Sequence, residues 1–200
     1  MTQLAVSSPV PFKLELGNAL RLSADELFEL CARNKELRIE RTAEGDLIVM
    51  SPAGLKTSMR NALITKALAV WAEVDGTGVA SDSSAGFRLP NGAMRSPDAA
   101  WILRSRFDAL AAEEQEKFAP LAPDFVIELL SPSDELERAQ EKMEEWRANG
   151  VRLGWLLDPR SRGVYVYRPG AAVEVLEQPS RIAGDPELPG FVLDLAAVWR

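Results

Sequence analysis

One short hydrophobic segment, residues 125–130, contains a single charged position, Glu128. Five of its six residues are apolar, and turn-forming residues border it on both sides. Such runs are typical of central strands that are covered on both faces. A carboxylate inside such a strand costs roughly several kcal/mol in desolvation unless it is protonated, paired or bound to a metal. Glu128 is therefore the first candidate for a functional residue.

The first half of the chain shows helical and strand patterns in turn. Ser23 and Glu26 form a capping box that predicts a helix over about 24–33. Strands are expected at 37–41 and 46–50, on either side of a hairpin-type turn. A long helix is predicted over about 56–74. Its wide apolar stripe, which we expect to be buried, comprises Met59, Leu63, Ile64, Ala67, Leu68, Val70, Trp71 and Val74.

The second half continues with shorter elements. Helices are expected over 107–118 and 134–149, and strands near 78–81, 86–89, 99–103, 125–130, 152–157, 164–168 and 173–177, before a terminal piece at 191–199. Between residues 98 and 158 the order is strand, helix, strand, helix, strand. That order predicts an α/β fold with a mixed sheet flanked by helices. We expect one domain over residues 1–200, in which residues 1–20 form an N-terminal arm.

Composition agrees with one globular domain of ordinary polarity. The 200 residues are 46% hydrophobic and 26% charged. No apolar run approaches the roughly 20 residues that span a bilayer, and the N-terminus lacks the features of a secretory signal. Without such a run, no membrane association is expected. Cys31 is the only cysteine, so a reducing cytoplasm is the expected location.

The absence of histidine restricts the chemistry that the chain can perform. With no histidine and one cysteine, a zinc site is nearly excluded. The commonest general base of enzymes, histidine itself, is also absent. What remains is carboxylates, lysine, arginine, serine, tyrosine or a hard cation held by oxygen ligands. The net charge of −7 argues against a general nucleic-acid binder. Binding to DNA would require a local basic patch or a metal that neutralises acidic residues.

Two carboxylates and one lysine form the candidate site. Asp98 precedes one predicted strand and Glu128 lies in another, so the two could share a cation such as Mg²⁺ or Mn²⁺. Lys142 lies at the edge of an apolar helix stripe, from which its ammonium could orient a water or stabilise phosphate charge. Each also has an ordinary explanation. Asp98 could be a turn residue, Glu128 could form a buried ion pair, and Lys142 could pack its stem on Trp146.

The chain resembles a large bacterial family of proposed restriction endonucleases in the PD-(D/E)XK nuclease superfamily. Order and spacing of the short motifs agree over about residues 20–199. The matching motifs are Leu37–Arg41, Leu47–Pro52, Ser96–Trp101, Pro123–Ser133, Glu141–Met143 and Gly154–Pro159.

This resemblance implies a restriction-endonuclease-like core, often dimeric, with Asp98 and Glu128 as metal ligands. It also implies a backbone carbonyl ligand from Leu129 and an additional acidic residue in Glu40, although neighbouring arginines offer Glu40 simple surface pairing. The chain departs from the superfamily pattern at Leu130, where the short motif has lysine. Lys142 on the following helix resembles the migrated lysine that this family uses instead.

Three functions are compatible with these features. The leading hypothesis is metal-dependent hydrolysis of DNA by a homodimer, with Asp98, Glu128, Lys142 and Glu40 in the site. The second is a catalytically silent module that keeps the fold and binds nucleic acid or protein. The third is a related activity on RNA or a nucleotide. The acidic composition favours the alternatives, whereas the presence of the two carboxylates and the lysine favours the enzyme.

Overall fold

The computed structural model describes residues 12–17, 20, 22–50 and 52–200 of the chain. The N-terminal arm predicted for residues 1–20 lies partly outside the described residues. Phe12–Leu14, within that range, form strand β1, which pairs with β3 (Leu47–Met50). No helix in the described part is both long and apolar enough to cross a membrane.

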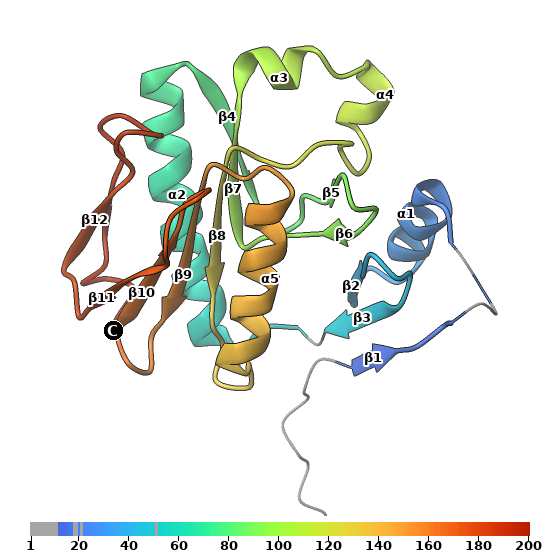
Figure 1. The fold of residues 1–200 in the computed structure, drawn as a ribbon, viewed down its shortest axis with the longest axis horizontal. Helices are drawn as coiled ribbons and strands as arrows, with labels where there is room; N and C mark the ends of the chain where they lie inside the picture. Colours follow the sequence, from blue (N-terminus) through green and yellow to red (C-terminus); the bar gives the residue numbers. More distant parts are fainter. Residues whose placement is uncertain (1–11, 18–19, 21, 51) are drawn as a thin grey trace, which may run out of the picture.

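The larger of two main sheets has six strands in the order β11-β10-β9-β8-β7-β4 (Figure 1). Strands β8 and β9 are parallel, and the other neighbours are antiparallel. All five residues of β8 are buried, as its apolar pattern predicts. The strands are β4 (Gly78–Asp82), β7 (Ala99–Leu103), β8 (Phe125–Leu129), β9 (Leu153–Asp158), β10 (Gly163–Tyr167) and β11 (Glu174–Glu177).

Helices α2 (Leu55–Asp75) and α5 (Leu136–Ala148) cover opposite faces of this sheet (Figure 1). Ile64 of α2 packs with Trp101 on one face, and Met143 of α5 packs with Val126 on the other. Trp101 and Val126 lie on opposite faces because successive side chains of a strand alternate in direction. The two helices therefore close the two halves of the hydrophobic core.

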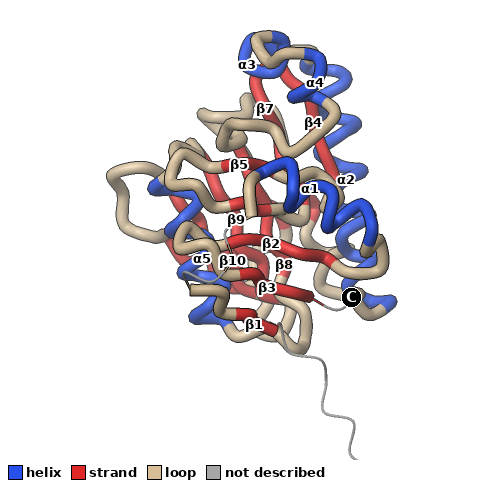
Figure 2. Tube along the Cα trace, turned by 90° about the vertical axis from the view of Figure 1, so that its right-hand side faces the viewer, coloured by secondary structure: helices blue, strands red, loops and turns tan. Residues whose placement is uncertain are grey.

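A second sheet, in the order β1-β3-β2-β6-β5, carries helix α1 (Ala24–Arg33) (Figure 2). Its remaining strands are β2 (Arg38–Arg41), β5 (Phe87–Arg88) and β6 (Met94–Arg95). Leu27 of α1 is fully buried against Ile39 and Leu47. The predicted capping box is confirmed, because Ser23 Oγ accepts from the Glu26 amide and the Glu26 carboxylate accepts from the Ser23 amide.

Two predictions of secondary structure need correction. The predicted helix over 107–118 is instead two short helices, α3 (Arg104–Asp108) and α4 (Ala112–Gln115). The terminal segment pairs in a further two-stranded sheet, β12 (Arg181–Ala183) with β13 (Val192–Asp194), of which β12 was not predicted. Short pieces such as these depend on tertiary contacts more than on their own pattern.

The predicted buried stripe of α2 is wrong in half of its members. Ile64 and Leu68 are fully buried, and Ala67 and Trp71 are partly buried against the same core. The other four side chains are exposed to solvent, because the helix turns a different apolar side to the sheet. These exposed members are Met59, Leu63, Val70 and Val74.

Gly78 in β4 provides a test of how closely the main sheet is packed. A Cβ atom built there would lie 2.3 Å from the Trp101 indole and 2.4 Å from the Ile102 carbonyl oxygen. Since backbone cannot yield as a flexible side chain does, we expect Gly78→Ala to lower the free energy of unfolding by about 1–3 kcal/mol, measured by urea denaturation. Gly163→Ala is the matched control, because its nearest neighbour is the Ser161 hydroxyl at 3.0 Å. Equal stability of the two variants would contradict the packing.

Candidate functional site: a carboxylate–lysine cleft between the two sheets

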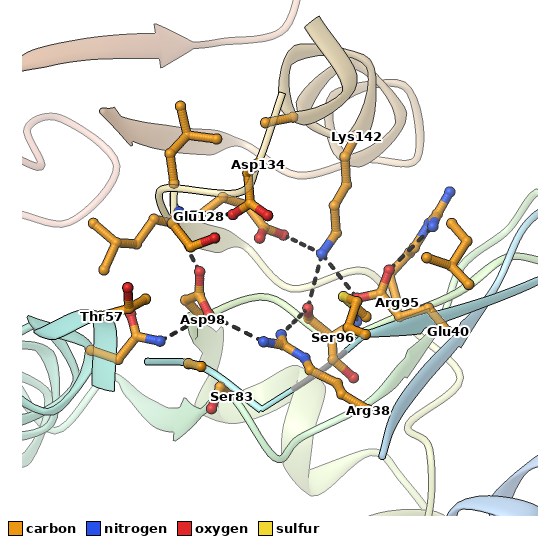
Figure 3. A pocket seen from close by; sticks show the side chains of 18 of the residues that line it. Arg38, Glu40, Thr57, Ser83, Arg95, Ser96, Asp98, Glu128, Asp134 and Lys142 are labelled. Atoms are coloured by element: carbon orange, nitrogen blue, oxygen red, sulfur yellow. Dashed lines mark hydrogen bonds and ion pairs between the residues drawn. The ribbon is translucent and has the colours of Figure 1, made fainter. Parts of the chain in front are cut away.

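A cleft of about 1810 Å³ opens between the two sheets and contains every candidate residue (Figure 3). Strand β2 of the smaller sheet forms one wall, and the N-terminal half of α2 forms another. The end of β8 and one side of α5 complete it. Typical small-molecule sites measure roughly 300–1,000 Å³, so this cleft has room for a segment of polymer.

Glu128 and Lys142 meet at the centre of the cleft. The Lys142 Nζ atom lies 2.9 Å from Glu128 Oε1, and the Trp146 indole N–H donates to the same oxygen at 2.9 Å. Lys142 and Trp146 are one turn apart on α5, so one helix face supplies both donors. The contacts found within the described chain engage only one oxygen of this carboxylate.

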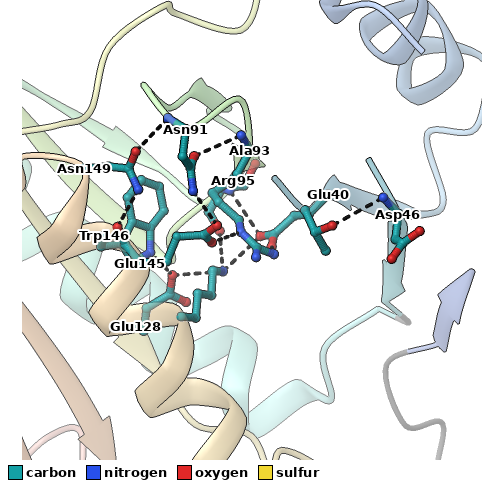
Figure 4. Close-up of polar contacts among 12 residues, drawn as sticks. Glu40, Asp46, Asn91, Ala93, Arg95, Glu128, Glu145, Trp146 and Asn149 are labelled. Atoms are coloured by element: carbon teal, nitrogen blue, oxygen red, sulfur yellow. Dashed lines mark hydrogen bonds and ion pairs between the residues drawn. The ribbon is translucent and has the colours of Figure 1, made fainter. Parts of the chain in front are cut away.

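Glu40 lies on the opposite side of the same ammonium from Glu128 (Figure 3), and Figure 4 shows it beside Arg95. Lys142 Nζ is 2.9 Å from Glu40 Oε1, and it also donates to the Ser96 carbonyl oxygen at 3.0 Å. The Ser96 amide donates to Glu40 Oε1, and Arg95 Nη1 donates to Glu40 Oε2 at 3.1 Å. Both oxygens of Glu40 are therefore engaged, and the contacts join strand β2 to the segment before β7.

Asp98 is held from three directions. Its Oδ2 accepts the Leu129 backbone N–H at 2.8 Å, which fixes it against the end of β8. Its Oδ1 accepts from Arg38 Nη1 at 3.2 Å and from Asn61 Nδ2 at 3.1 Å. Arg38 also donates to the Ser96 carbonyl oxygen at 2.6 Å. The carboxylate thus connects the larger sheet, β2 and α2.

Burial and neighbouring charge act differently on the two glutamates. Burial raises the pKa of Glu128, and the charges of Asp98 and Glu40 act in the same direction against the opposing effect of Lys142. Burial also works against ionisation of Glu40, but Lys142, Arg95 and Arg38 lower its pKa to about 2. Although burial disfavours its charge, Glu128 and Glu40 raise the pKa of Lys142. Lys142 therefore stays protonated at neutral pH.

The cleft gathers all the residues named from the sequence, together with several that sequence reasoning missed. Arg38 was treated only as a surface partner, although it lies two residues before Glu40 and so shares its side of β2. That alternation could have identified Arg38 as a cleft residue. No sequence pattern identified Asn61 or Arg95, because they reach the cleft only through the packing of α2 and β6.

A hard divalent cation is compatible with part of this arrangement. Asp98 Oδ2 and Glu128 Oε2 retain lone pairs beyond the contacts found in the described chain. The N–H and C=O of a strand residue point to the same side, so the Leu129 carbonyl lies on the side of Asp98. Among the described residues, however, no three acidic or cysteine side chains cluster as a metal site. Glu40 therefore does not complete a three-carboxylate set.

Glu40 gives the cleft a defined pH dependence. Its pKa in the folded state, about 2, lies below the ordinary 4.5, so its stabilising contribution is present above pH 4.5 and is lost as the pH falls toward 2. We expect Glu40→Gln to cost roughly 3 kcal/mol at pH 7 and to flatten the stability profile over that range. Urea denaturation between pH 2 and pH 7 in chelator measures this. Glu137→Gln, at an exposed position of α5 outside the cleft lining, is the control. Parallel profiles for Glu40→Gln and the unsubstituted chain would refute the assignment.

Comparison with known proteins agrees with this fold. The model of the Uma2 family, described as putative restriction endonucleases, matches residues 24–196. The structure is similar to the crystal structure of a putative nuclease belonging to DUF820 from Anabaena variabilis, with a TM-score of 0.73 and 20% sequence identity. That similarity covers 89% of this chain and 97% of that chain, and it supports a restriction-endonuclease-like mixed sheet flanked by helices. No curated protein matches the chain. Because the family model spans most of its length, the chain belongs to the Uma2 family of putative restriction endonucleases.

Proposed function

We propose that the protein is a metal-dependent endonuclease that hydrolyses phosphodiester bonds in DNA. The observation that carries the proposal is the meeting of two buried carboxylates, Asp98 and Glu128, in one cleft beside the Lys142 ammonium. Membership of a family of putative restriction endonucleases supports the same reaction class. A DNA substrate and a single free cysteine fit a cytoplasmic protein.

Asp98, Glu128 and the Leu129 carbonyl would hold a divalent cation, Mg²⁺ or Mn²⁺, with waters filling the remaining positions. Such a cation polarises a phosphoryl oxygen and makes a water molecule more acidic. Asp98 is positioned for this role by the Leu129 amide and by Asn61. Glu128 is positioned by the Trp146 indole.

Lys142 acts in this proposal as a positive charge and a hydrogen-bond donor. Its raised pKa keeps it protonated, so it cannot accept the proton of the attacking water. As the water oxygen bonds to phosphorus and one P–O ester bond breaks, the attacking water releases a proton to solvent, the departing ester oxygen takes one up from solvent, and negative charge develops on the phosphoryl oxygens. An ammonium in the cleft stabilises that charge. Arg38, whose side chain is 31% exposed, can bind the same phosphate.

The walls of the cleft carry charges of both signs. Apart from the central residues Arg38, Glu40, Arg95, Asp98, Glu128 and Lys142, the basic residues are Lys13, Lys35, Lys66 and Arg138, and the acidic residues are Glu36, Asp82, Asp134, Glu135, Glu141 and Glu145. This mixture does not form a continuous basic track for a phosphate backbone. The central cations and a divalent metal would therefore supply most of the attraction for DNA.

The hydrogen bonds that the Asp98 carboxylate already accepts favour a second candidate function, a catalytically silent module that binds nucleic acid or protein. Arg38, Asn61 and the Leu129 amide already supply three hydrogen bonds to its two oxygens. A network of this kind can persist for structural reasons alone. Metal affinity separates the two candidates, because a silent module needs no cation at Asp98.

Cleavage assays test the proposed activity directly. We expect cleavage of DNA with Mg²⁺ or Mn²⁺, none in chelator, and a loss of about 10²-fold or more in Asp98→Asn and Glu128→Gln. Duplex DNA, single-stranded DNA and RNA are incubated in parallel and products are resolved by electrophoresis. Because burial opposes ionisation of Glu128, Glu128→Gln should keep or raise stability in chelator. Glu137→Gln, at an exposed position of α5 outside the cleft lining, should cleave normally. Cleavage of RNA alone would correct the substrate, and failure on every substrate would favour the silent module.

Lys142 needs a design that separates its structural from its chemical role. Lys142→Met leaves both Glu40 and Glu128 without their shared counter-charge, so we expect a loss of roughly 3–5 kcal/mol in stability. The two ion pairs distinguish Lys142 from a lysine that only packs its stem on Trp146, whose replacement by methionine would change stability little.

Adding Glu128→Gln to Lys142→Met should recover part of that stability, because one uncompensated charge is removed. Activity should stay low in the double variant. The measurements are urea denaturation in chelator and the cleavage rate with metal. If Lys142→Met cleaves at the normal rate while it remains folded, Lys142 has no part in the chemistry.

A further inference from the structure

Helix α2 is apolar on two opposite sides. One side, which includes Ile64, Leu68 and Ala72, packs on the main sheet. On the other side five large apolar side chains are between 43% and 86% exposed, and we call them the outer face of α2. They are Leu55, Met59, Leu63, Val70 and Val74.

The outer face is an apolar stripe along the helix that Lys66 interrupts near its middle. At 100° per residue its five members fall within about 100° on the helical wheel, and at 1.5 Å per residue they extend over about 30 Å. A single exposed leucine needs no explanation, whereas five large apolar side chains exposed on one side of a helix are typical of a surface that contacts another protein. A helix that is apolar all round is generally covered on every side.

The stripe is nearly symmetrical about its own midpoint, between Ile64 and Thr65. If two copies of the helix pack antiparallel about that midpoint, Leu55 of one lies level with Val74 of the other. Met59 lies level with Val70, and both lie near the centre line of the stripe. A twofold contact requires a surface that is complementary to itself in this way.

The charges of α2 also suit an antiparallel partner. Lys56 and Arg60 lie near its N-terminus and Glu73 and Asp75 lie at its C-terminus, which is the reverse of what its own dipole favours. In an antiparallel pair the basic end of each helix lies beside the negative end of the other. The acidic C-terminal end of each helix likewise lies beside the N-terminal end of the other, where the helix dipole is positive. The complementarity is absent from a parallel pair.

We propose that the outer face of α2 binds a second copy of this chain as an antiparallel, twofold-symmetric helix pair. Lys66 lies in the stripe beside the midpoint, where its long stem can cover apolar surface while its ammonium reaches solvent. Lys66 and Ala62 also line the cleft. Both clefts therefore open next to the twofold axis and on the same side of the pair. If the proposed function holds, one nucleic acid can contact both.

Complementary substitutions test the antiparallel contact. We expect the unsubstituted chain to be a dimer at about 10 μM by sedimentation equilibrium, and Met59→Glu or Val70→Lys alone to weaken dimerisation by about tenfold or more. Mixing the two variants should restore a dimer, because the carboxylate introduced in one chain would then face the ammonium introduced in the other. Both positions are more than half exposed in the single chain, so folding should be unaffected.

Val175→Lys is the matched control, since Val175 is equally exposed but lies on the edge strand β11. It should leave the dimer intact. A monomer at every concentration would overturn the proposal and assign the face to a different occupant. A dimer that survives both single substitutions, or variants that fail to re-pair on mixing, would also overturn it. The readout is molecular mass, so the result does not depend on nuclease activity.

Discussion

The ammonium of Lys142 holds together the two parts of the molecule between which the cleft forms. It lies 2.9 Å from a carboxylate oxygen of Glu40, on the smaller sheet, and 2.9 Å from one of Glu128, on the larger sheet. Two buried carboxylates would repel each other without it, and each would carry a desolvation penalty. Placing one cation between them compensates both charges and fixes the position of strand β2 against β8. The geometry of the cleft depends on this contact.

Much of the fold could be predicted because its patterns are local. The five buried residues of β8, the capping box at Ser23 and the hairpin between β2 and β3 follow from alternation, caps and turns in the printed sequence. The exposed face of α2 could not be predicted, since a helix that is apolar on two sides does not reveal which side meets the sheet. The short strands β6 and β12 are too short to show a period of their own; β6 pairs with the distant β2, and β12 pairs with the nearby β13.

The candidate site was predictable at the residues whose placement conflicts with their surroundings. Glu128 interrupts an apolar strand, so it indicated a compensating partner. Lys142 lies at the edge of an apolar helix stripe, from which its ammonium could reach the same site. Arg95 and Asn61 were not predictable, because a polar residue in a two-residue strand or on a helix carries no such conflict. The sequence indicated which carboxylates meet in the cleft, whereas the structure shows that Lys142 is shared between Glu40 and Glu128.

Anomalous diffraction from crystals soaked in Mn²⁺ tests directly whether Asp98 and Glu128 hold a divalent cation. We expect one strong anomalous peak within about 2.0–2.4 Å of an oxygen of each carboxylate and of the Leu129 carbonyl. The peak should disappear in crystals of Glu128→Gln. A fully soaked crystal without a peak between these residues, with Arg38 and Lys142 still bound to the carboxylates, would contradict the metal site and leave a structural ion-pair network.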